Sequence, residues 1–226
     1  YEILPSLVGS EMCIRDSLLA AGSIELNTVL GLVYKRGLFM SEAPSGSMLA
    51  VMGLKQSVID KICIDISNEE DVFVAPANIN TPNQIVIGGD HKAIDIASIK
   101  LKEEGAKRCI KLKVSTASHC SLMNESALKF QKELDNIDII KPAVDVVQNV
   151  NGKVIQNPEL IKNNLIKQLT KPVQWVETMK QIASNNGILI ECGPGKVLSG
   201  LAKQNGIENI LTMSSQSFEE DLRNMI

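Results

Sequence analysis

His119 is the residue of this sequence whose type and setting suit proton transfer. It lies between a predicted strand that ends at Val114 and a predicted helix that begins at Ser121. The positive end of a helix dipole disfavours imidazolium, and a neutral imidazole is what a general base requires. His119 is therefore a candidate general base. Its position fits equally well a polar histidine that only holds a tight loop together.

A nucleophile to match this histidine is harder to find. The sequence contains no G-x-S-x-G, the motif that exposes a catalytic serine at a strand-to-helix turn. Neither Ser10 nor Cys13 is assigned as a nucleophile. Cys120 stands beside His119, but adjacent side chains usually point apart, so we expect a buried thiol there. His91, at a predicted helix start, is expected at the surface.

Composition argues against several classes of protein. A net charge of −3 and 3% aromatic residues argue against general nucleic-acid binding, which needs basic patches or stacking platforms. No apolar run reaches the roughly 18 residues that a membrane span needs, and no basic region precedes an apolar run as in a signal peptide. Five cysteines without metal-ligand spacing and two distant histidines indicate free thiols in a reducing cytoplasm and no metal site.

Residues 1–16 show no helical or strand period. The chain starts with Tyr1 rather than Met, which suggests a fragment or a processed form. The stretch resembles translated adapter sequence of the kind that contaminates assembled reads, and a frayed native N-terminus is the alternative. We therefore expect residues 1–16 to be non-native or disordered.

The elements that must position His119 fall into two groups, of which the first is residues 47–113. These follow the order β-α-β-β-α-β, which is that of a ferredoxin-like module. The predicted strands are 47–52, 72–79, 84–87 and 108–114, and the predicted helices are 55–66 and 90–104. A chain of 226 residues, 44% of them hydrophobic, is long enough to carry such a module beside a larger domain.

The second group alternates helices with strands. Predicted helices cover 18–40 (interrupted at Gly22), 121–134, 158–169, 173–184, a stretch ending at 204 and the C-terminus. Predicted strands cover 143–147, 188–191 and 209–212. This alternation predicts an α/β fold with a parallel sheet flanked by helices. Residues 17–46 and 114–226 would form this core, and the 47–113 module would interrupt it.

Five short motifs follow one another between Ser17 and the C-terminus. They are YKRGLFM at 34–40, NINTPNQIVIG at 78–88, STASHCSLM at 115–123, KPVQW at 171–175 and ECGPGKVL at 191–198. Each is weak alone, but all five in this order resemble the malonyl-CoA:acyl-carrier-protein transacylases. That resemblance implies a hydrolase-like α/β core with a ferredoxin-like insert, in agreement with the order of predicted elements.

The resemblance also implies a two-step acyl transfer. A serine attacks the malonyl thioester of coenzyme A while a histidine accepts its proton, and the phosphopantetheine thiol of acyl carrier protein then collects the malonyl group. His119 matches the family's base, and Arg36 matches the arginine that binds the malonate carboxylate. The backbone carbonyl of Gln174 matches one that orients the histidine. Met40 is assigned with Arg36 and Gln174 to substrate binding.

Two of these assignments have ordinary alternatives. Without the family, Arg36 would be taken for a surface charge on an amphipathic helix, and Gln174 for a polar residue at a helix start. The chain also departs from the family, whose G-H-S-x-G serine should stand a few residues before Leu18. The family's N-terminal glutamine loop, which contributes to the oxyanion hole, has no counterpart either. We therefore expect a malonyltransferase fragment that lacks its nucleophile and is inactive by itself.

Substrate and partners follow from the same resemblance. It implies malonyl-CoA as substrate, no permanently bound cofactor, acyl carrier protein as partner, and a cytoplasmic monomer in fatty-acid synthesis. Ser118 stands where many relatives carry a bulky aromatic residue, so methylmalonyl stays open as the acyl group. A polyketide-synthase acyltransferase is one alternative. A non-catalytic ferredoxin-like binding module is another, but an RNA-binding version needs aromatic residues on its strands, and Phe73 is the only one there.

Overall fold

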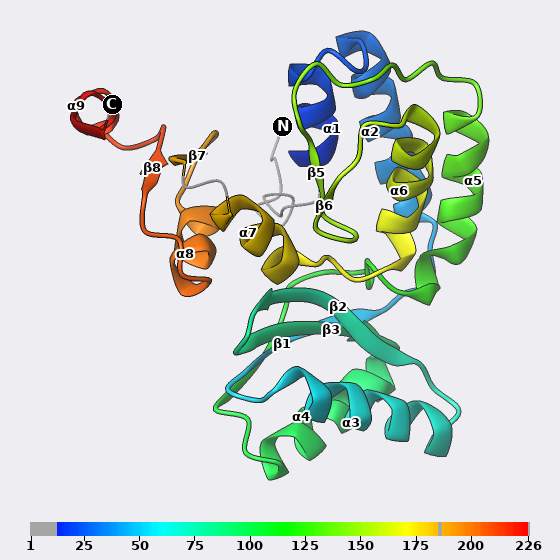
Figure 1. Ribbon diagram of the computed structural model, residues 1–226. Coiled ribbons are helices and arrows are strands. Elements are labelled where there is room, and N and C mark those ends of the chain that lie inside the picture. The colour runs from blue at the N-terminus through cyan, green and yellow to red at the C-terminus, as the bar shows by residue number, and fades with distance from the viewer. Residues whose placement is uncertain (1–12, 185–186, 226) are drawn as a thin grey trace.

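The computed structural model describes residues 13–184 and 187–225 of the chain. Figure 1 shows three connected parts: a bundle of helices at the top right, a sheet with two helices below it, and a C-terminal arm at the left. His119 lies in the segment that leaves the sheet and leads into the bundle. Both parts therefore determine where this residue is placed.

In the described part of the chain, the lower unit is a four-stranded antiparallel sheet. Its strands are β1 (Ser47–Met52), β2 (Val74–Thr81), β3 (Gln84–Gly89) and β4 (Arg108–Lys111), in the order β2-β3-β1-β4. Helices α3 (Gln56–Glu69) and α4 (His91–Glu103) cover one face of it (Figure 1). The strands and helices expected from 47 to 113 are all present, with bounds shifted by a few residues.

Alternation along β1 gives the sheet two buried faces. Leu49 and Val51 belong to the apolar cluster under α3 and α4, whereas Met48 packs with Ala117 on the opposite face. Successive side chains of a strand point to opposite faces, so one strand contributes to both clusters. The segment that carries His119 is thereby packed against the face of the sheet that α3 and α4 leave uncovered.

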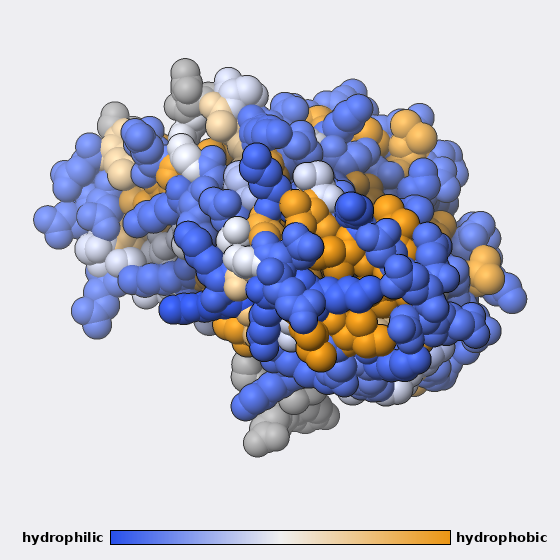
Figure 2. Space-filling model, turned by 90° about the horizontal axis from the view of Figure 1, so that it is seen from below, coloured by the Kyte–Doolittle hydropathy of each residue, from blue (hydrophilic) through white to orange (hydrophobic). Residues whose placement is uncertain are grey.

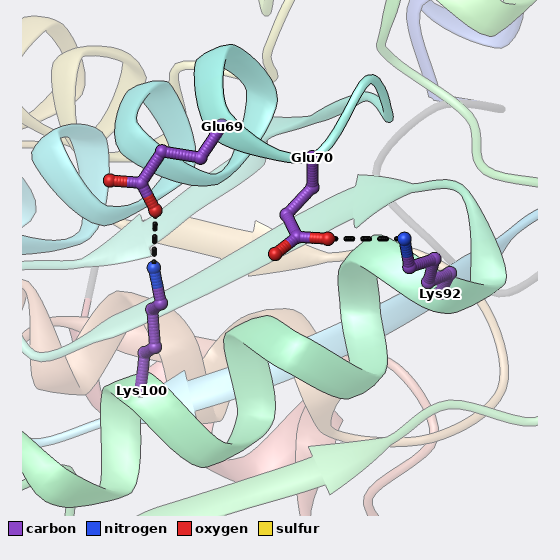
Figure 3. Close-up of polar contacts among 4 residues, drawn as sticks. All are labelled: Glu69, Glu70, Lys92 and Lys100. Carbon is purple, nitrogen blue, oxygen red and sulfur yellow. Dashed lines mark hydrogen bonds and ion pairs between the residues drawn. The ribbon is translucent and has the colours of Figure 1, made fainter.

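Charged pairs join α3 to α4 at the surface. Lys92 Nζ lies 3.1 Å from Glu70 Oε2, and Lys100 Nζ lies 2.9 Å from Glu69 Oε2 (Figure 3). Exposed ion pairs of this kind are screened by water and contribute little to stability. The helices are held chiefly by buried apolar side chains, of which Ile59 is fully inaccessible.

The upper unit is a bundle built, within the described residues, from four helices. They are α1 (Cys13–Ala20), α2 (Leu26–Ser41), α5 (Asn124–Leu134) and α6 (Pro158–Thr170), and a 3-10 turn, η2 (Ser121–Met123), leads into α5. Each helix contributes to one apolar core, through Leu18, Leu32, Phe130 and Leu165. Asn157 caps α6, because its Oδ1 accepts the N–H of Leu160 at 3.0 Å and Pro158 follows it in the first turn.

The C-terminal arm alternates helices and strands. It consists of α7 (Trp175–Ala183), β7 (Leu189–Glu191), α8 (Val197–Gln204), β8 (Ile210–Thr212) and α9 (Phe218–Met225). β7 and β8 pair in parallel, with Ile190 opposite Leu211. Glu191 accepts the N–H groups of Leu198 at 3.0 Å and Ser199 at 2.9 Å, so a carboxylate satisfies two donors in the first turn of α8.

The α/β class is confirmed, but the expected parallel sheet is much reduced. Among the described strands, parallel pairing joins only β7 and β8. The strand expected at 143–147 shrinks to β5 (Val147–Gln148), which pairs with β6 (Lys153–Val154) in a short hairpin. The backbone before β5 bonds elsewhere: the N–H of Ala143 donates to the carbonyl of Ala21, in the turn between α1 and α2, at 2.8 Å.

Only residues 13–16 of the N-terminal stretch 1–16 belong to the described residues. Residues 1–12, with Ser10 among them, lie outside the described residues. Residues 13–16, expected to be non-native or disordered, are helical and begin α1. Ile14 is buried one turn before Leu18, which is the spacing of a helix face that packs on a core. Within the described residues, no helix combines the length and apolar character needed to cross a membrane.

Candidate active site around His119

His119 is held in a left-handed backbone conformation. Its φ is +61°, and the residue is only 1% exposed. Residues with a side chain adopt this conformation at a cost and keep it where the surroundings fix it, often at functional sites. The turn that contains His119, residues 117–120, is closed by Cys120, whose Sγ donates to the carbonyl of Ala117 at 3.2 Å.

The His119 ring contacts a backbone carbonyl. Its Nδ1 lies 2.6 Å from the carbonyl oxygen of Gln168. Since a carbonyl can only accept, we assign the hydrogen to Nδ1, and the neutral ring then has its lone pair on Nε2. The hydrogen bond that one ring nitrogen of a histidine makes commonly determines which of the two nitrogens acts as the base. The geometry therefore presents Nε2 as the basic nitrogen.

Pro172 explains why the Gln168 carbonyl is available to His119. Inside a helix this carbonyl would accept the N–H of the residue four positions later, but that residue is Pro172, which has none. The N–H of Lys171 does not replace it, because it donates to the carbonyl of Lys167 at 2.8 Å. The last turn of α6 thus leaves the Gln168 carbonyl for the histidine.

This contact corrects the orienting role expected for Gln174. The carbonyl of Gln174 accepts both the N–H and the hydroxyl of Thr178, each at 3.0 Å, and so belongs to the first turn of α7. The N–H of Gln174 donates to the carbonyl of Asn149 at 2.7 Å. Gln174 therefore starts a helix near the site, and the carbonyl at the histidine is that of Gln168.

The side chain of Gln168 fixes this end of α6. Its Oε1 accepts from Arg15 Nη1 at 3.1 Å, and its Nε2 donates to Asn149 Oδ1 at 3.0 Å. The residue is 1% exposed, and buried amides of this kind are normally hydrogen-bonded as this one is. Sequence reasoning missed Gln168 and Asn149. The available signal was Pro172, four residues after Gln168.

Arg36 is a buried residue on α2. It is 5% exposed, whereas the preceding Tyr34 and Lys35 are exposed. The alternative of an ordinary surface charge is therefore wrong. α2 is fastened to α5, because the hydroxyl of Ser126 donates to the carbonyl of Phe39 at 2.7 Å. Arg36 thus lies on a helix that docks against the one following His119.

The remaining candidates lie where their types suggest. Met40 is half-buried and packs against the core of the bundle. His91 is exposed, as expected for the start of α4. The hydroxyl of Ser118 donates to the Sδ of Met48 at 3.7 Å, so Ser118 faces the sheet.

The thiol beside the histidine is not poised to react. Cys120 is buried, as expected, and burial raises the pKa of its thiol to about 11. A thiol with such a pKa is protonated at neutral pH and is a poor nucleophile. Of the cysteines in the described chain, Cys63, Cys109, Cys120 and Cys192 are all free. No cluster of histidine, cysteine and carboxylate side chains there could hold a metal ion.

Comparison with known proteins decides the family. The chain is 39% identical over 214 residues to the malonyl CoA-acyl carrier protein transacylase of Escherichia coli O157:H7, covering 92% of this chain and 68% of that relative. This chain belongs to the malonyl-CoA–acyl carrier protein transacylase family. The Bacillus subtilis member is 42% identical over 193 residues, which are 84% of this chain and 61% of that protein. No family model matches the chain.

Solved structures of transacylases share the fold. The enzyme of Xanthomonas oryzae pv. oryzae has a TM-score of 0.87 at 36% identity, over 93% of this chain and 68% of that chain. A malonyl-transacylase solved in complex with a type II polyketide-synthase acyl carrier protein has a TM-score of 0.86 at 35% identity, over 93% and 69%. The resemblance inferred from the five motifs is confirmed.

Proposed function

We propose that this chain supplies the histidine half of a malonyl-transfer site. The reaction moves a malonyl group from coenzyme A to the phosphopantetheine thiol of acyl carrier protein through an acyl-serine, in fatty-acid synthesis. The observation that carries this proposal is His119, a buried imidazole whose Nδ1 lies against the carbonyl oxygen of Gln168. Membership of the transacylase family supports malonyl as the acyl group.

In this proposal His119 acts first as a base and then as an acid. Nε2 accepts the serine proton as the serine oxygen attacks the thioester carbonyl, and it returns the proton to the departing thiolate of coenzyme A. In the second step Nε2 takes the proton of the phosphopantetheine thiol and gives it to the serine oxygen as the ester breaks. The Gln168 carbonyl stabilises the imidazolium formed in each step.

Arg36 is proposed to hold the malonate carboxylate. A guanidinium presents two parallel N–H donors that match the two oxygens of a carboxylate. Burial of Arg36 supports the role, because a charge–charge contact is stronger away from water. Met40, one turn later on α2, and Gln174 remain proposed substrate contacts.

Domain boundaries are also part of the proposal. Residues 47–113 form a ferredoxin-like subdomain, supported by the β1-α3-β2-β3-α4-β4 order and the β2-β3-β1-β4 sheet. Residues 17–46 and 114–226 form part of a hydrolase-like core, supported by the parallel pair β7–β8. We further propose a cytoplasmic monomer with acyl carrier protein as its partner. A similar transacylase has been solved in complex with such a carrier protein, which supports the choice of partner.

The serine of the reaction is the part that this sequence does not supply. It contains no G-x-S-x-G. We therefore expect the chain as written to give no malonyl transfer from malonyl-CoA to acyl carrier protein. Turnover at an ordinary rate that is lost on changing Ser10 or Cys13 would show that the sequence has its own nucleophile.

A chimera tests the proposed function directly. The N-terminal segment of the Escherichia coli relative, with the family's serine motif, would precede residue 17 of this chain. We expect the chimera to transfer malonyl groups to acyl carrier protein, which the chain alone would not do. A folded chimera with no transfer would contradict the proposal.

A polyketide-type transacylase is the second candidate. One observation favours it, which is the similarity to a transacylase solved with a type II polyketide-synthase acyl carrier protein. Assaying the chimera with acyl carrier proteins of both pathways, and with malonyl-CoA and methylmalonyl-CoA, separates the two. A clear preference for the polyketide carrier protein would favour this candidate.

A further inference from the structure

Two serines and a second histidine meet at the start of α4. The ring of His91 lies between them, with Nε2 2.8 Å from the Oγ of Ser45 and Nδ1 2.5 Å from the Oγ of Ser47. Ser47 is buried at the start of β1, whereas Ser45 and His91 are exposed. His91 thereby ties the chain segment that enters β1 to the first residue of α4.

That segment lies directly on residues 115–119, which we call the histidine loop. Ser45 forms an antiparallel bridge with Thr116. The N–H of Gly46 donates to the carbonyl of Ser115 at 3.3 Å. The two segments are therefore joined backbone to backbone just before the candidate base.

Gly46 allows this close approach. A Cβ on this residue would lie 3.1 Å from the Cβ of Ala117 and 2.9 Å from the carbonyl oxygen of Gly89. Backbone atoms cannot give way as the end of a flexible side chain can, so the position suits glycine. The histidine loop is thus in contact with a segment that has little freedom to move.

The conformation of His119 depends on what surrounds the histidine loop. A left-handed residue other than glycine persists when neighbouring structure fixes it. The Gln168 carbonyl holds the ring from the end of α6. The segment that enters β1 holds the loop from the sheet, and His91 fastens that segment through Ser45 and Ser47.

We propose that His91 is a positioning residue for His119. By fastening Ser45 and Ser47 to α4, it keeps the histidine loop in the conformation that places Nδ1 of His119 on the Gln168 carbonyl. Serine hydroxyls donate or accept, so the tie persists whichever ring nitrogen of His91 bears the hydrogen. The catalytic meaning of this role rests on the proposed function, whereas the positioning itself does not.

The histidine content of the chain makes the proposal measurable. There are only two histidines, so the ring nitrogens of each can be followed separately by long-range ¹⁵N–¹H correlation NMR of the full chain. For the unchanged chain we expect His119 to carry its ring hydrogen on Nδ1 and none on Nε2. In His91→Ala and in Ser45→Ala, we expect the two nitrogen shifts of His119 to converge as the tautomers average.

Two further variants distinguish positioning from general loosening. Lys92→Ala changes the next residue of α4 and removes only an exposed ion pair with Glu70 (Figure 3), so the His119 shifts should stay unchanged. His91→Gln keeps a hydrogen-bonding group near the position of Nε2. It should therefore restore part of the separation between the two shifts that His91→Ala removes.

Unchanged His119 shifts in Ser45→Ala and His91→Ala would overturn the proposal. An equal response in Lys92→Ala would overturn it too, because it would show that any change near α4 loosens the loop. Ser45 is exposed, so Ser45→Ala decides the question even if His91→Ala does not fold. A chimera without malonyl transfer, combined with the expected NMR result, would count against the proposed function alone.

Discussion

At the scale of single residues, burial separates Arg36 from its neighbours on α2. Lys35 lies at the surface and forms an ion pair with Glu133, whereas the Arg36 side chain is directed into the protein. An ion pair exposed to water in this way contributes little to stability. A buried guanidinium instead has a defined direction and defined neighbours, which is what recognition of a planar anion requires.

Arg36→Ala in the chimera should therefore harm malonyl transfer far more than acetyl transfer. Losing a hydrogen bond to a charged group costs about 1.5–3 kcal/mol, which corresponds to a fall of roughly 10- to 100-fold in kcat/KM for malonyl-CoA. Arg36→Lys should recover only part of that, because an ammonium cannot pair bidentately. Equal losses for both acyl groups would remove Arg36 from the carboxylate role.

Cys63 on α3 predicts how the free energy of unfolding changes with pH, which can be measured without an activity assay. Burial, with a smaller effect of the Asp60 charge, raises the pKa of its thiol to about 12 from 9.0. The folded state then holds this proton more tightly than the unfolded state. The contribution of the protonated Cys63 thiol to the free energy of unfolding is complete below pH 9. It is lost as the pH rises towards 12, by about 1.4 kcal/mol per pH unit.

Urea titrations between pH 8 and pH 11 check this expectation. The free energy of unfolding should fall with pH in the unchanged chain, and Cys63→Ala should reduce the slope. Cys120, whose raised pKa of about 11 acts in the same direction, should account for part of the remaining slope. If the free energy of unfolding falls equally steeply with pH with and without Cys63, the Cys63 thiol is not the group responsible.

The residue types of the site were easier to predict than their partners. His119 and Arg36 stand in local sequences that resemble motifs of the family, and this resemblance singled them out. The carbonyl that holds the His119 ring belongs to the backbone, and every residue has one. Which carbonyl is available depends on where α6 ends and on Pro172. The family resemblance implied the carbonyl of Gln174, whereas the structure has that of Gln168 at the ring.

At the scale of elements, the end of α6 determines the tautomer of the histidine. Pro172→Ala would supply the missing N–H four residues after Gln168, which could then compete for its carbonyl. In the chimera we expect lower malonyl transfer with an unchanged far-ultraviolet circular dichroism spectrum. Lys171→Ala is the matched control, because Lys171 already has its own N–H bond to Lys167. An unchanged transfer rate in Pro172→Ala would contradict the role given to Pro172.

Helices and strands whose apolar residues recur at regular spacing were predicted well. Those that depend on contacts with distant parts of the chain were not. The lower sheet and its helices show alternation and 3.6-residue spacing, and all six elements are present. The expected strand at 143–147 has suitable residues, but Ala143 bonds to Ala21 in the turn between α1 and α2 instead of to a neighbouring strand. Local sequence carries no information about a partner more than 100 residues away.

At the scale of the whole molecule, the face that carries α3 and α4 exposes hydrophobic surface. Figure 2 shows hydrophobic residues there, interrupted by hydrophilic ones. Ile64 of α3 and Ile99 of α4 are large exposed hydrophobic residues, at 59% and 61% exposed. Exposed apolar patches promote association, and charged substitutions within them improve solubility.

Ile99→Lys should therefore raise the soluble yield of the chain. An exposed substitution normally changes stability by no more than about 0.5 kcal/mol, so the urea midpoint should barely move. Ile94→Lys on the same helix is the comparison, because Ile94 is fully buried and its replacement should prevent folding. Light scattering and urea titration check both variants. Unaltered aggregation in Ile99→Lys would show that this face is not responsible.

His119 is proposed as the general base of malonyl transfer. The most direct test is kcat/KM for malonyl transfer by the chimera with His119→Ala, relative to the chimera with His119 intact. General base catalysis typically contributes about 10²- to 10⁴-fold, so we predict a loss in that range while the protein stays folded. A folded His119→Ala chimera that transfers malonyl groups at the unchanged rate would show that His119 is not the general base.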